Sequence, residues 1–209
     1  MATRFMYKNL ATAALGIALS PLLAATTAAS PASCNTVAQV FDPVGDTMFN
    51  APAFQDIVLG QMTRTASGDF ALLMEMAGPV PIAPALPPPA HTEMWWIWVF
   101  DLDPTTAPKG YPFLCNESLS EFLVYVSWDG TEFAGTAIDR RPLLTGGEAI
   151  ITSVPFHIDG TIVEADLAYE LIGAVPASFD WSPRTLDWSG PVGSAGYNVL
   201  DIALTVFSP

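Results

Sequence analysis

Cysteine, histidine and basic residues are scarce in this sequence. It has two Cys, two His and seven Lys and Arg in 209 residues, against 21 Asp and Glu. It contains no Gly-x-Ser-x-Gly elbow, no His-Glu-x-x-His pair, no Cys-x-x-Cys-His haem attachment and no glycine-rich nucleotide loop. Each of these motifs places a nucleophile, a metal or a phosphate in a defined local geometry. Without them we expect a protein that is not an enzyme.

The shortage of basic residues leaves a strongly acidic chain. All 21 acidic residues follow residue 30, whereas two of the seven basic ones precede it, so the part after residue 30 carries 5 − 21 = −16. Phosphate backbones and anionic lipids repel such a charge, and nucleic acid is therefore not an expected partner. Disorder is not expected either, because 51% of the residues are hydrophobic and six are Trp.

Residues 1–30 have the order of a secretory signal peptide. Arg4 and Lys8 form a basic head, an uncharged apolar stretch covers residues 10–25, and small residues follow it. A Ser-Pro pair interrupts the apolar stretch, which is shorter than the about 20 residues that cross a bilayer. A retained membrane anchor is the alternative. We predict export to a secreted or periplasmic location, with no membrane span left after the signal is removed.

The two cysteines, Cys34 and Cys115, both follow the signal. In an oxidising compartment an even pair most simply forms a disulfide, which here would join the start of the domain to a mid-chain loop. The alternative is that Cys34 is a lipidated first residue. The residues before it lack the Leu that a lipobox carries three places before its Cys, and this favours the disulfide.

Residues 34–209 predict a single all-β domain. Short runs rich in β-branched and aromatic residues recur, with turn residues between them. The expected strands are 37–41, 55–65, 69–77, 94–102, 121–128, 131–138, 148–158, 161–166, 178–188 and 199–207. Asp129-Gly130 and Asp159-Gly160 separate neighbouring runs and favour antiparallel hairpins. Only 167–172 is expected to form a helical turn or two, because 19 prolines interrupt the chain.

This pattern predicts an antiparallel β-sandwich of two sheets, immunoglobulin-like or jelly-roll-like, with an up-and-down barrel as the alternative. The most apolar run, 94–102, has no clean alternation, so we expect a central strand with both faces covered. The segment 78–93 holds six prolines and is expected to be an extended loop. It is either a flap over a binding face or a solvated connection.

Aspartates gather at two places along the chain, and together they predict a calcium site. The candidate ligands are Asp42, Asp46, Asp56, Asp101 and Asp103. Hard cations such as Ca²⁺ take oxygen ligands from carboxylates and backbone carbonyls on bent loops. Asp42 and Asp46 share a tight Pro/Gly loop, and the last two aspartates alternate at strand spacing, so their side chains point the same way. The alternative is that Asp42 and Asp46 only form a turn.

Several of these residues belong to short motifs. They are Phe-Asp-Pro-Val-Gly-Asp at 41–46, Pro-Ala-Phe-Gln-Asp-Ile at 52–57, Asp-Leu-Asp at 101–103 before Gly110-Tyr111, and Asp-Gly-Thr at 159–161. Together they resemble, loosely over 37–188, the family 9 carbohydrate-binding modules and the related DOMON domains. The resemblance implies a β-sandwich, often with bound Ca²⁺, in secreted proteins that bind sugars or, in some branches, haem. One departure is Lys109-Gly110, where these families usually have Thr-Gly.

Aromatic residues offer a second kind of site, because sugar rings pack on exposed aromatic faces beside carboxylates. The expected ligand-binding residues are Trp95, Tyr111, Trp181 and Trp188. Trp95 and Trp96 adjoin in a strand and therefore point to opposite faces. We expect Trp96, Trp98 and Phe100 to lie in the core.

Haem ligation is a third option. The only histidines are His91 and His157, and Met74, Met76 or Met94 offers a thioether as a second axial ligand. The sequence thus predicts an exported, non-catalytic binding domain whose ligand is a polysaccharide or glycan. A structural or surface-interaction protein without a small-molecule ligand is the alternative, and a haem-binding domain is the third candidate.

Overall fold

The structure is a computed structural model that describes residues 36–86, 91–103, 105, 120–177, 179–189, 197–203 and 205–207. The chain divides into two compact units, Met1–Ala32 and Ser33–Pro209, and all described residues belong to the second unit. The predicted signal at 1–30, Cys34 and Cys115 lie outside the described residues. In the part that is described, no helix is long and apolar enough to cross a membrane.

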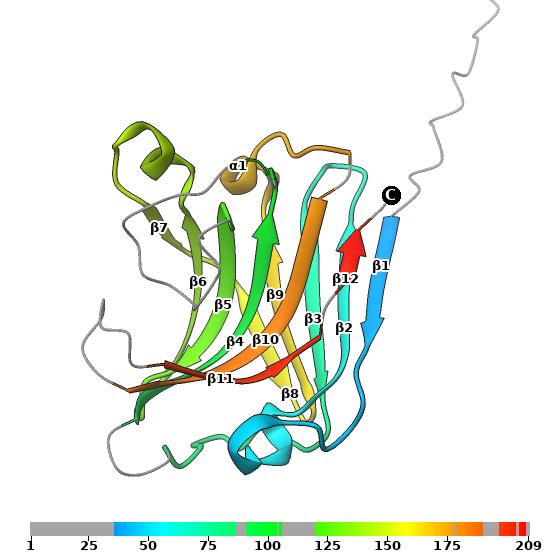
Figure 1. Cartoon of the computed structure of the whole chain (residues 1–209), viewed down its shortest axis with the longest axis vertical. Coiled ribbons are helices and arrows are strands. Elements are labelled where there is room, and N and C mark those ends of the chain that lie inside the picture. Colours follow the sequence, from blue (N-terminus) through cyan, green and yellow to red (C-terminus); the bar gives the residue numbers. More distant parts are fainter. Residues whose placement is uncertain are drawn as a thin grey trace, which may run out of the picture. The chain divides into compact units, whose positions relative to one another are not determined.

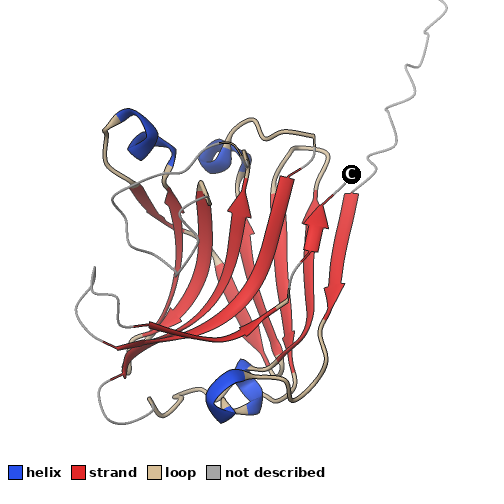
Figure 2. Ribbon diagram, viewed as in Figure 1, coloured by secondary structure: helices blue, strands red, loops and turns tan. Residues whose placement is uncertain are grey.

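Two antiparallel sheets form the fold, which confirms the predicted β-sandwich (Figures 1 and 2). The first sheet has the order β1 (Thr36–Phe41), β2 (Ile57–Arg64), β3 (Phe70–Met76), β9 (Ile162–Leu167) and β8 (Phe156–Asp159). The second has the order β11 (Tyr197–Ile202), β10 (Phe179–Ser189), β4 (His91–Asp101), β5 (Phe122–Trp128), β6 (Phe133–Asp139) and β7 (Ile150–Ser153), and β12 (Thr205–Phe207) also pairs with β10. Helical structure in the described part is limited to α1 (Tyr169–Ile172) and the 3₁₀ turns η1 (Met48–Asn50), η2 (Ala53–Gln55) and η3 (Arg141–Thr145).

Both predicted Asp-Gly hairpins are present. β5 pairs with β6 across Asp129-Gly130, and β8 pairs with β9 across Asp159-Gly160. The two glycines have φ of 94° and 59°, a conformation that a residue with a side chain rarely adopts. The short helix α1 confirms the helical turn expected at 167–172.

Two of the predicted strands are each divided in the structure. The run 148–158 forms β7 and β8, which belong to different sheets, and the break falls at Val154-Pro155. Pro155 has no N–H to continue a ladder, so the chain leaves the second sheet there. The run 199–207 forms β11 and β12, which pair with successive parts of β10. Between them the Ala203 N–H donates to the Pro183 carbonyl at 3.2 Å.

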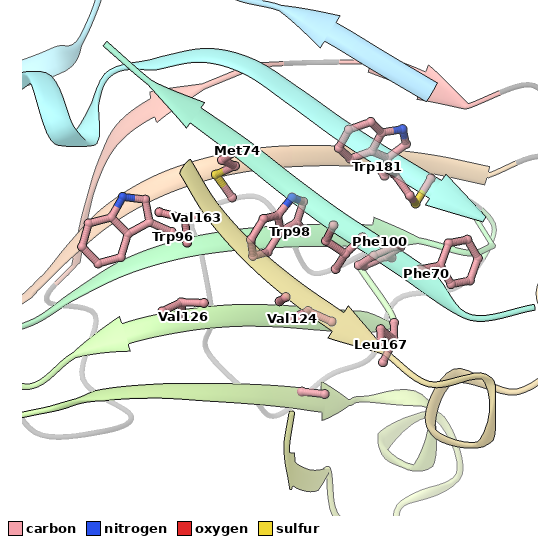
Figure 3. Close-up of a cluster of buried hydrophobic side chains, with 14 of the residues drawn as sticks. Phe70, Met74, Trp96, Trp98, Phe100, Val124, Val126, Val163, Leu167 and Trp181 are labelled. Atoms are coloured by element: carbon pink, nitrogen blue, oxygen red, sulfur yellow. The ribbon is translucent and has the colours of Figure 1, made fainter. Parts of the chain in front are cut away.

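Strand β4 is central, and both of its faces are covered, as its apolar sequence predicts. It lies between β10 and β5. Trp96, Trp98 and Phe100 are fully buried in the core between the sheets, which Figure 3 shows together with residues of β3, β5, β9 and β10. The alternate residues, Trp95, Ile97 and Val99, are buried in a second cluster with side chains of β5, β6 and β10. The Pro-rich stretch before β4 is shorter than expected, because the strand begins at residue 91.

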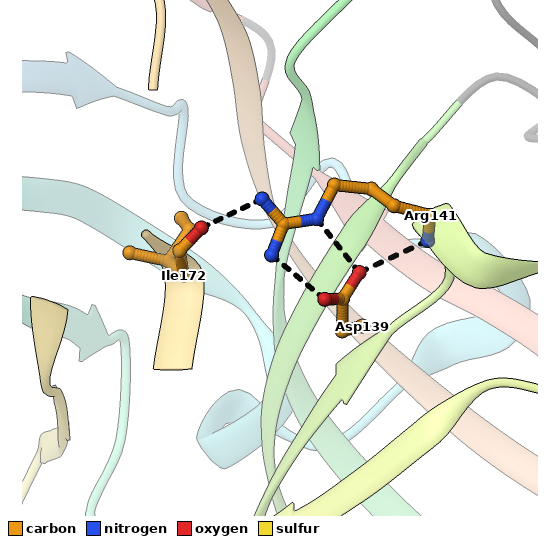
Figure 4. Close-up of polar contacts among 3 residues, drawn as sticks. All are labelled: Asp139, Arg141 and Ile172. Carbon is orange, nitrogen blue, oxygen red and sulfur yellow. Dashed lines mark hydrogen bonds and ion pairs between the residues drawn. The ribbon is translucent and has the colours of Figure 1, made fainter. Parts of the chain in front are cut away.

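A charged pair ties η3 and β6 to the end of α1. The Arg141 guanidinium donates from Nε and Nη2 to the two oxygens of Asp139, at 2.8 and 2.7 Å, and from Nη1 to the Ile172 carbonyl at 2.7 Å (Figure 4). The hydrogen bonds to the Asp139 carboxylate raise the pKa of Arg141 further, so the guanidinium stays charged at any physiological pH. The planar fork therefore fixes the C-terminal end of α1 at one end of the sandwich.

Candidate metal centre

The loop that joins β1 to β2 extends from the first sheet onto the second. Its end is held by hydrogen bonds to β11 and β10. The Ile57 N–H donates to Asp201 Oδ2 of β11 at 2.6 Å. Gln55 Nε2 donates to Asp187 Oδ1 of β10 at 2.9 Å, and the Gln55 carbonyl accepts the Thr185 hydroxyl at 2.5 Å. Gln55 and Thr185 are fully buried. These buried bonds fix the loop beside the C-terminal strand β11.

Three aspartates from these two regions converge. One carboxylate oxygen of each of Asp42, Asp46 and Asp201 lies within 4.8 Å of the other two. Asp201 is 5% exposed, Asp42 is partly buried and Asp46 is exposed, so the cluster is closed on one side and open to solvent on the other. This arrangement offers a hard cation several oxygen ligands and leaves room for further ligands on the open side.

A fourth carboxylate, Asp56, adjoins the cluster. It is 5% exposed, its Oδ2 accepts the Gly45 N–H at 2.9 Å, and its charge acts on Asp42. The other oxygen of Asp56 and the Oδ2 of Asp42 are buried and accept no hydrogen bond. A buried carboxylate oxygen without a donor costs free energy, and a bound cation would remove that cost.

The carboxylates of the cluster disfavour one another's charge. Burial, followed by the negative charges of Asp201 and Asp46, raises the pKa of Asp42 to about 7. Burial raises the pKa of Asp201 as well, although the N–H groups of Ile57 and Ile202 oppose the shift. A divalent cation would act in the opposite direction and keep all of these carboxylates ionised.

Asp101 and Asp103 do not join this cluster, which corrects the expectation of one shared site. In the register of the second sheet, Asp201 pairs with Thr185, and Thr185 pairs with Trp96 of β4. Asp101 lies five residues further along β4, or about 16 Å at the rise of an extended strand. The expected calcium ligands are therefore divided between two ends of the sheets.

Asp101 has its own acidic surroundings. Burial, then the charges of Glu121 and Asp180, raise the pKa of Asp101 to about 6. Glu121 accepts the Leu102 N–H at 2.7 Å, which fixes the end of β4. Asp103 is exposed, and the Thr105 hydroxyl and N–H lower its pKa. Asp103 therefore acts as a turn former, the role that we had considered for Asp42 and Asp46.

Sequence reasoning missed Asp201. It is the one acidic residue in the apolar run 199–207. A lone aspartate in a buried strand is costly unless it has a partner, and this cost was the signal that could have identified it. Its position beside Asp42 depends on the contact of the β1–β2 loop with β11, two segments that are far apart in sequence.

The aromatic residues expected to bind sugar are not accessible where the structure describes them. Trp95 is 4% exposed and Trp181 is 1% exposed. The Trp95 ring stacks on Tyr125 at 4.4 Å between centroids with an interplanar angle of 8°. Tyr111 lies outside the described residues, and of Trp188 only the backbone in β10 is described. Trp95 and Trp181 form core instead of a binding platform, because residues 94–100 of β4 and 181–187 of β10 are all buried.

Of the haem ligands considered from the sequence, His157 and the methionines do not converge, and the side chain of His91 lies outside the described part. The three methionines are all core residues: Met74, Met76 and Met94. His157 is exposed on β8. Its neighbour Ile158 pairs with Val163, and Val163 pairs with Met74, so Ile158 and Met74 lie on the same face of the sheet. Since alternate residues point to opposite faces, His157 points away from the methionines.

In comparisons with known proteins, no family model, no curated protein and no solved structure matches the chain. The resemblance to the family 9 carbohydrate-binding modules and DOMON domains therefore stays a prediction that depends on the short motifs.

Proposed function

We propose that this protein is an exported, non-catalytic β-sandwich that binds calcium between Asp42, Asp46 and Asp201, with Asp56 beside them. The observation that supports this most directly is the convergence of three carboxylates from the β1–β2 loop and β11. The buried, unpaired oxygen of Asp56 is an independent sign that a positive charge belongs there.

Calcium is the proposed ion because every candidate ligand is an oxygen atom on a loop or at a strand end. Ca²⁺ accepts six to eight such ligands in an adaptable geometry, whereas Mg²⁺ demands a near-ideal octahedron and Zn²⁺ favours nitrogen and sulfur. A bound ion would connect the β1–β2 loop of the first sheet to β11 of the second. It would therefore stabilise the contact between the sheets.

Of the two non-haem roles, surface interaction is supported better than carbohydrate binding. The β1–β2 region exposes Phe41, Val44, Met48 and Phe49 beside the carboxylates. Carbohydrate is the second candidate, and the exposed rings of Phe41 and Phe49 support it. Retention on polysaccharide affinity gels in calcium would establish that role, and the absence of retention would remove it.

Thermal unfolding tests the calcium proposal. A ligand that binds only the native state raises its stability, by about 2.7 kcal/mol when its concentration is 100 times Kd. We expect millimolar CaCl₂ to raise the Tm of the wild-type protein and EDTA to reverse the change. Asp201→Asn should lose the response, whereas Asp166→Asn, an exposed aspartate of β9, should keep it. An equal Tm in CaCl₂ and EDTA for the wild-type protein would contradict the proposal.

A further inference from the structure

The β1–β2 loop exposes four large apolar side chains within nine consecutive residues. Phe41, Val44, Met48 and Phe49 are 74, 67, 50 and 73% exposed. They lie between the last residue of β1 and η1, at one end of the sheets (Figure 1). We call these four residues the apolar loop. Contiguous exposed apolar side chains on a soluble domain mark a surface that meets another apolar phase.

The backbone of the apolar loop is strained where it exposes a ring. Phe49 has φ 59° and ψ 23°, and Asn50 has φ 52°. Bulky residues rarely adopt this left-handed conformation, and such strain gathers at ligand sites. A strained residue that also turns a phenyl ring into water carries two costs in the isolated protein. Burial of the ring in a bound state would offset both costs.

The size and shape of the apolar loop favour a lipid bilayer over a protein or a sugar. A buried aromatic side chain covers about 150–250 Å², so the four side chains together offer roughly 500 Å² at most. A stable protein interface needs about 800 Å² on each partner. Val44 and Met48 have no flat face for a sugar ring, whereas interfacial insertion needs only a few apolar side chains that enter the headgroup region together.

Charge determines when such insertion is favourable. Asp42 follows Phe41, and Asp46 lies between Val44 and Met48, so insertion of the apolar loop brings both carboxylates to the headgroups. Unneutralised, they would resist dehydration and repel lipid phosphates. A cation in the cluster neutralises them and can take a lipid phosphate oxygen on its open side.

We propose that the apolar loop docks this protein onto the surface of a phospholipid bilayer when the adjacent cation site is occupied. The calcium dependence rests on the proposed function, but the docking residues are distinct from the cation ligands. The two proposals can therefore fail separately.

The test is flotation of the protein with vesicles of phosphatidylcholine, which carries a phosphate but no net charge, in about 1 mM CaCl₂ or in EDTA. This calcium concentration is on the order of the Kd of extracellular calcium-binding modules. We expect the wild-type protein to float in calcium and at least tenfold less in EDTA. Phe49→Gly removes the ring and relieves the strained φ, so it should fold at least as well and yet float about tenfold less. Phe41→Ser should have a similar effect on flotation.

The matched control is Leu144→Ser. Leu144 is 43% exposed on η3, which lies at the opposite end of the sheets (Figure 1), and its loss should leave flotation unchanged. A wild-type protein that binds calcium but does not float overturns the bilayer proposal and leaves the cation site intact. Flotation that Phe49→Gly does not reduce also overturns it. If Phe49→Gly abolishes calcium-dependent retention on polysaccharide, the apolar loop binds a sugar instead. If it abolishes self-association measured by light scattering, the apolar loop binds a second copy of the chain instead.

Discussion

In the proposed calcium site, Asp42 is the residue at which a proton would compete with the cation. Its partial burial, followed by the charges of Asp201 and Asp46, raises its pKa to about 7, and one of its oxygens accepts no hydrogen bond. The same crowding that favours a proton in the apoprotein favours a cation when one is present. The carboxyl group is therefore charged or neutral according to what is bound.

Calcium affinity should fall with pH below about 7. A cation can bind only after the proton leaves Asp42, so below that pKa one proton is displaced for each ion and the affinity drops about tenfold per pH unit. We expect calorimetry to show binding about tenfold weaker at pH 6 than at pH 8. Asp42→Asn should bind weakly at both pH values, and an affinity that does not vary with pH in the wild-type protein would refute the assignment.

Asp101 gives a second, opposite kind of pH dependence, in stability. Burial and the charges of Glu121 and Asp180 raise its folded pKa from 3.8 to about 6. Between these values the native state binds more protons than the unfolded state, so the free energy of unfolding falls as pH rises from about 4 to about 6. Asp101→Asn should remove about 1 kcal/mol of this fall, a figure reduced for solvent screening.

Urea unfolding at pH 4.5 and pH 7 measures this difference. The exposed Asp166→Asn variant serves as the control, because its charge is remote from the Asp101 cluster in the strand order. If Asp101→Asn and the wild-type protein lose equal stability between the two pH values, the raised pKa is not a property of the folded protein.

At the scale of elements, β2 and β10 approach closely although they belong to different sheets. A Cβ atom placed on Gly60 would lie 2.4 Å from Cγ of Pro183 and 3.1 Å from Cγ1 of Val40. Any side chain at this point of β2 would clash with Pro183, so glycine is required there. Nearby, the β1–β2 loop and β11 bring the carboxylates of Asp42, Asp46 and Asp201 together.

Gly60→Ala should destabilise the protein by about 1–3 kcal/mol, the usual cost of overpacking a tight interior. Because the obstructing atom belongs to the Pro183 ring, Pro183→Ala should recover part of the loss when combined with Gly60→Ala. Chemical unfolding of the two single variants and the double variant forms a double-mutant cycle. Strict additivity would show that the two residues do not meet.

For the whole molecule, the sequence is informative about local structure and much less so about contacts between distant strands. Short apolar runs and Asp-Gly turns correctly predict most of the strands and both hairpins, and the lack of alternation in 94–102 predicts the buried position of β4. The break at Val154-Pro155 was missed although proline carries the signal, because the flanking residues are equally strand-like on both sides. Asp201 could not be placed next to Asp42 because the contact between the β1–β2 loop and β11 joins segments near opposite ends of the described chain.

The same limit explains the errors at the predicted ligand sites. Trp95 was expected to face a ligand because its aromatic ring can pack on a sugar, although the apolar run 94–102 predicts a strand that is covered on both faces. The structure covers that side as well, with Ile97, Leu123 and Leu186 in one buried cluster. Period-two alternation separates the two faces of a strand, but it does not say which face is covered. Asp101 was expected to lie near Asp42 because both belong to short acidic stretches of the sequence. The sequence gives no strand register from which the distance between them could be judged.

The most direct test of this account is calorimetric titration of calcium into metal-free protein at pH 8. We predict one ion bound per chain in the wild-type protein and no measurable binding in Asp201→Asn, while Asp103→Asn binds like the wild-type protein because Asp103 lies with the separate Asp101 group. No heat from the wild-type protein, or equal binding by Asp201→Asn, would contradict a cation site that joins the two sheets.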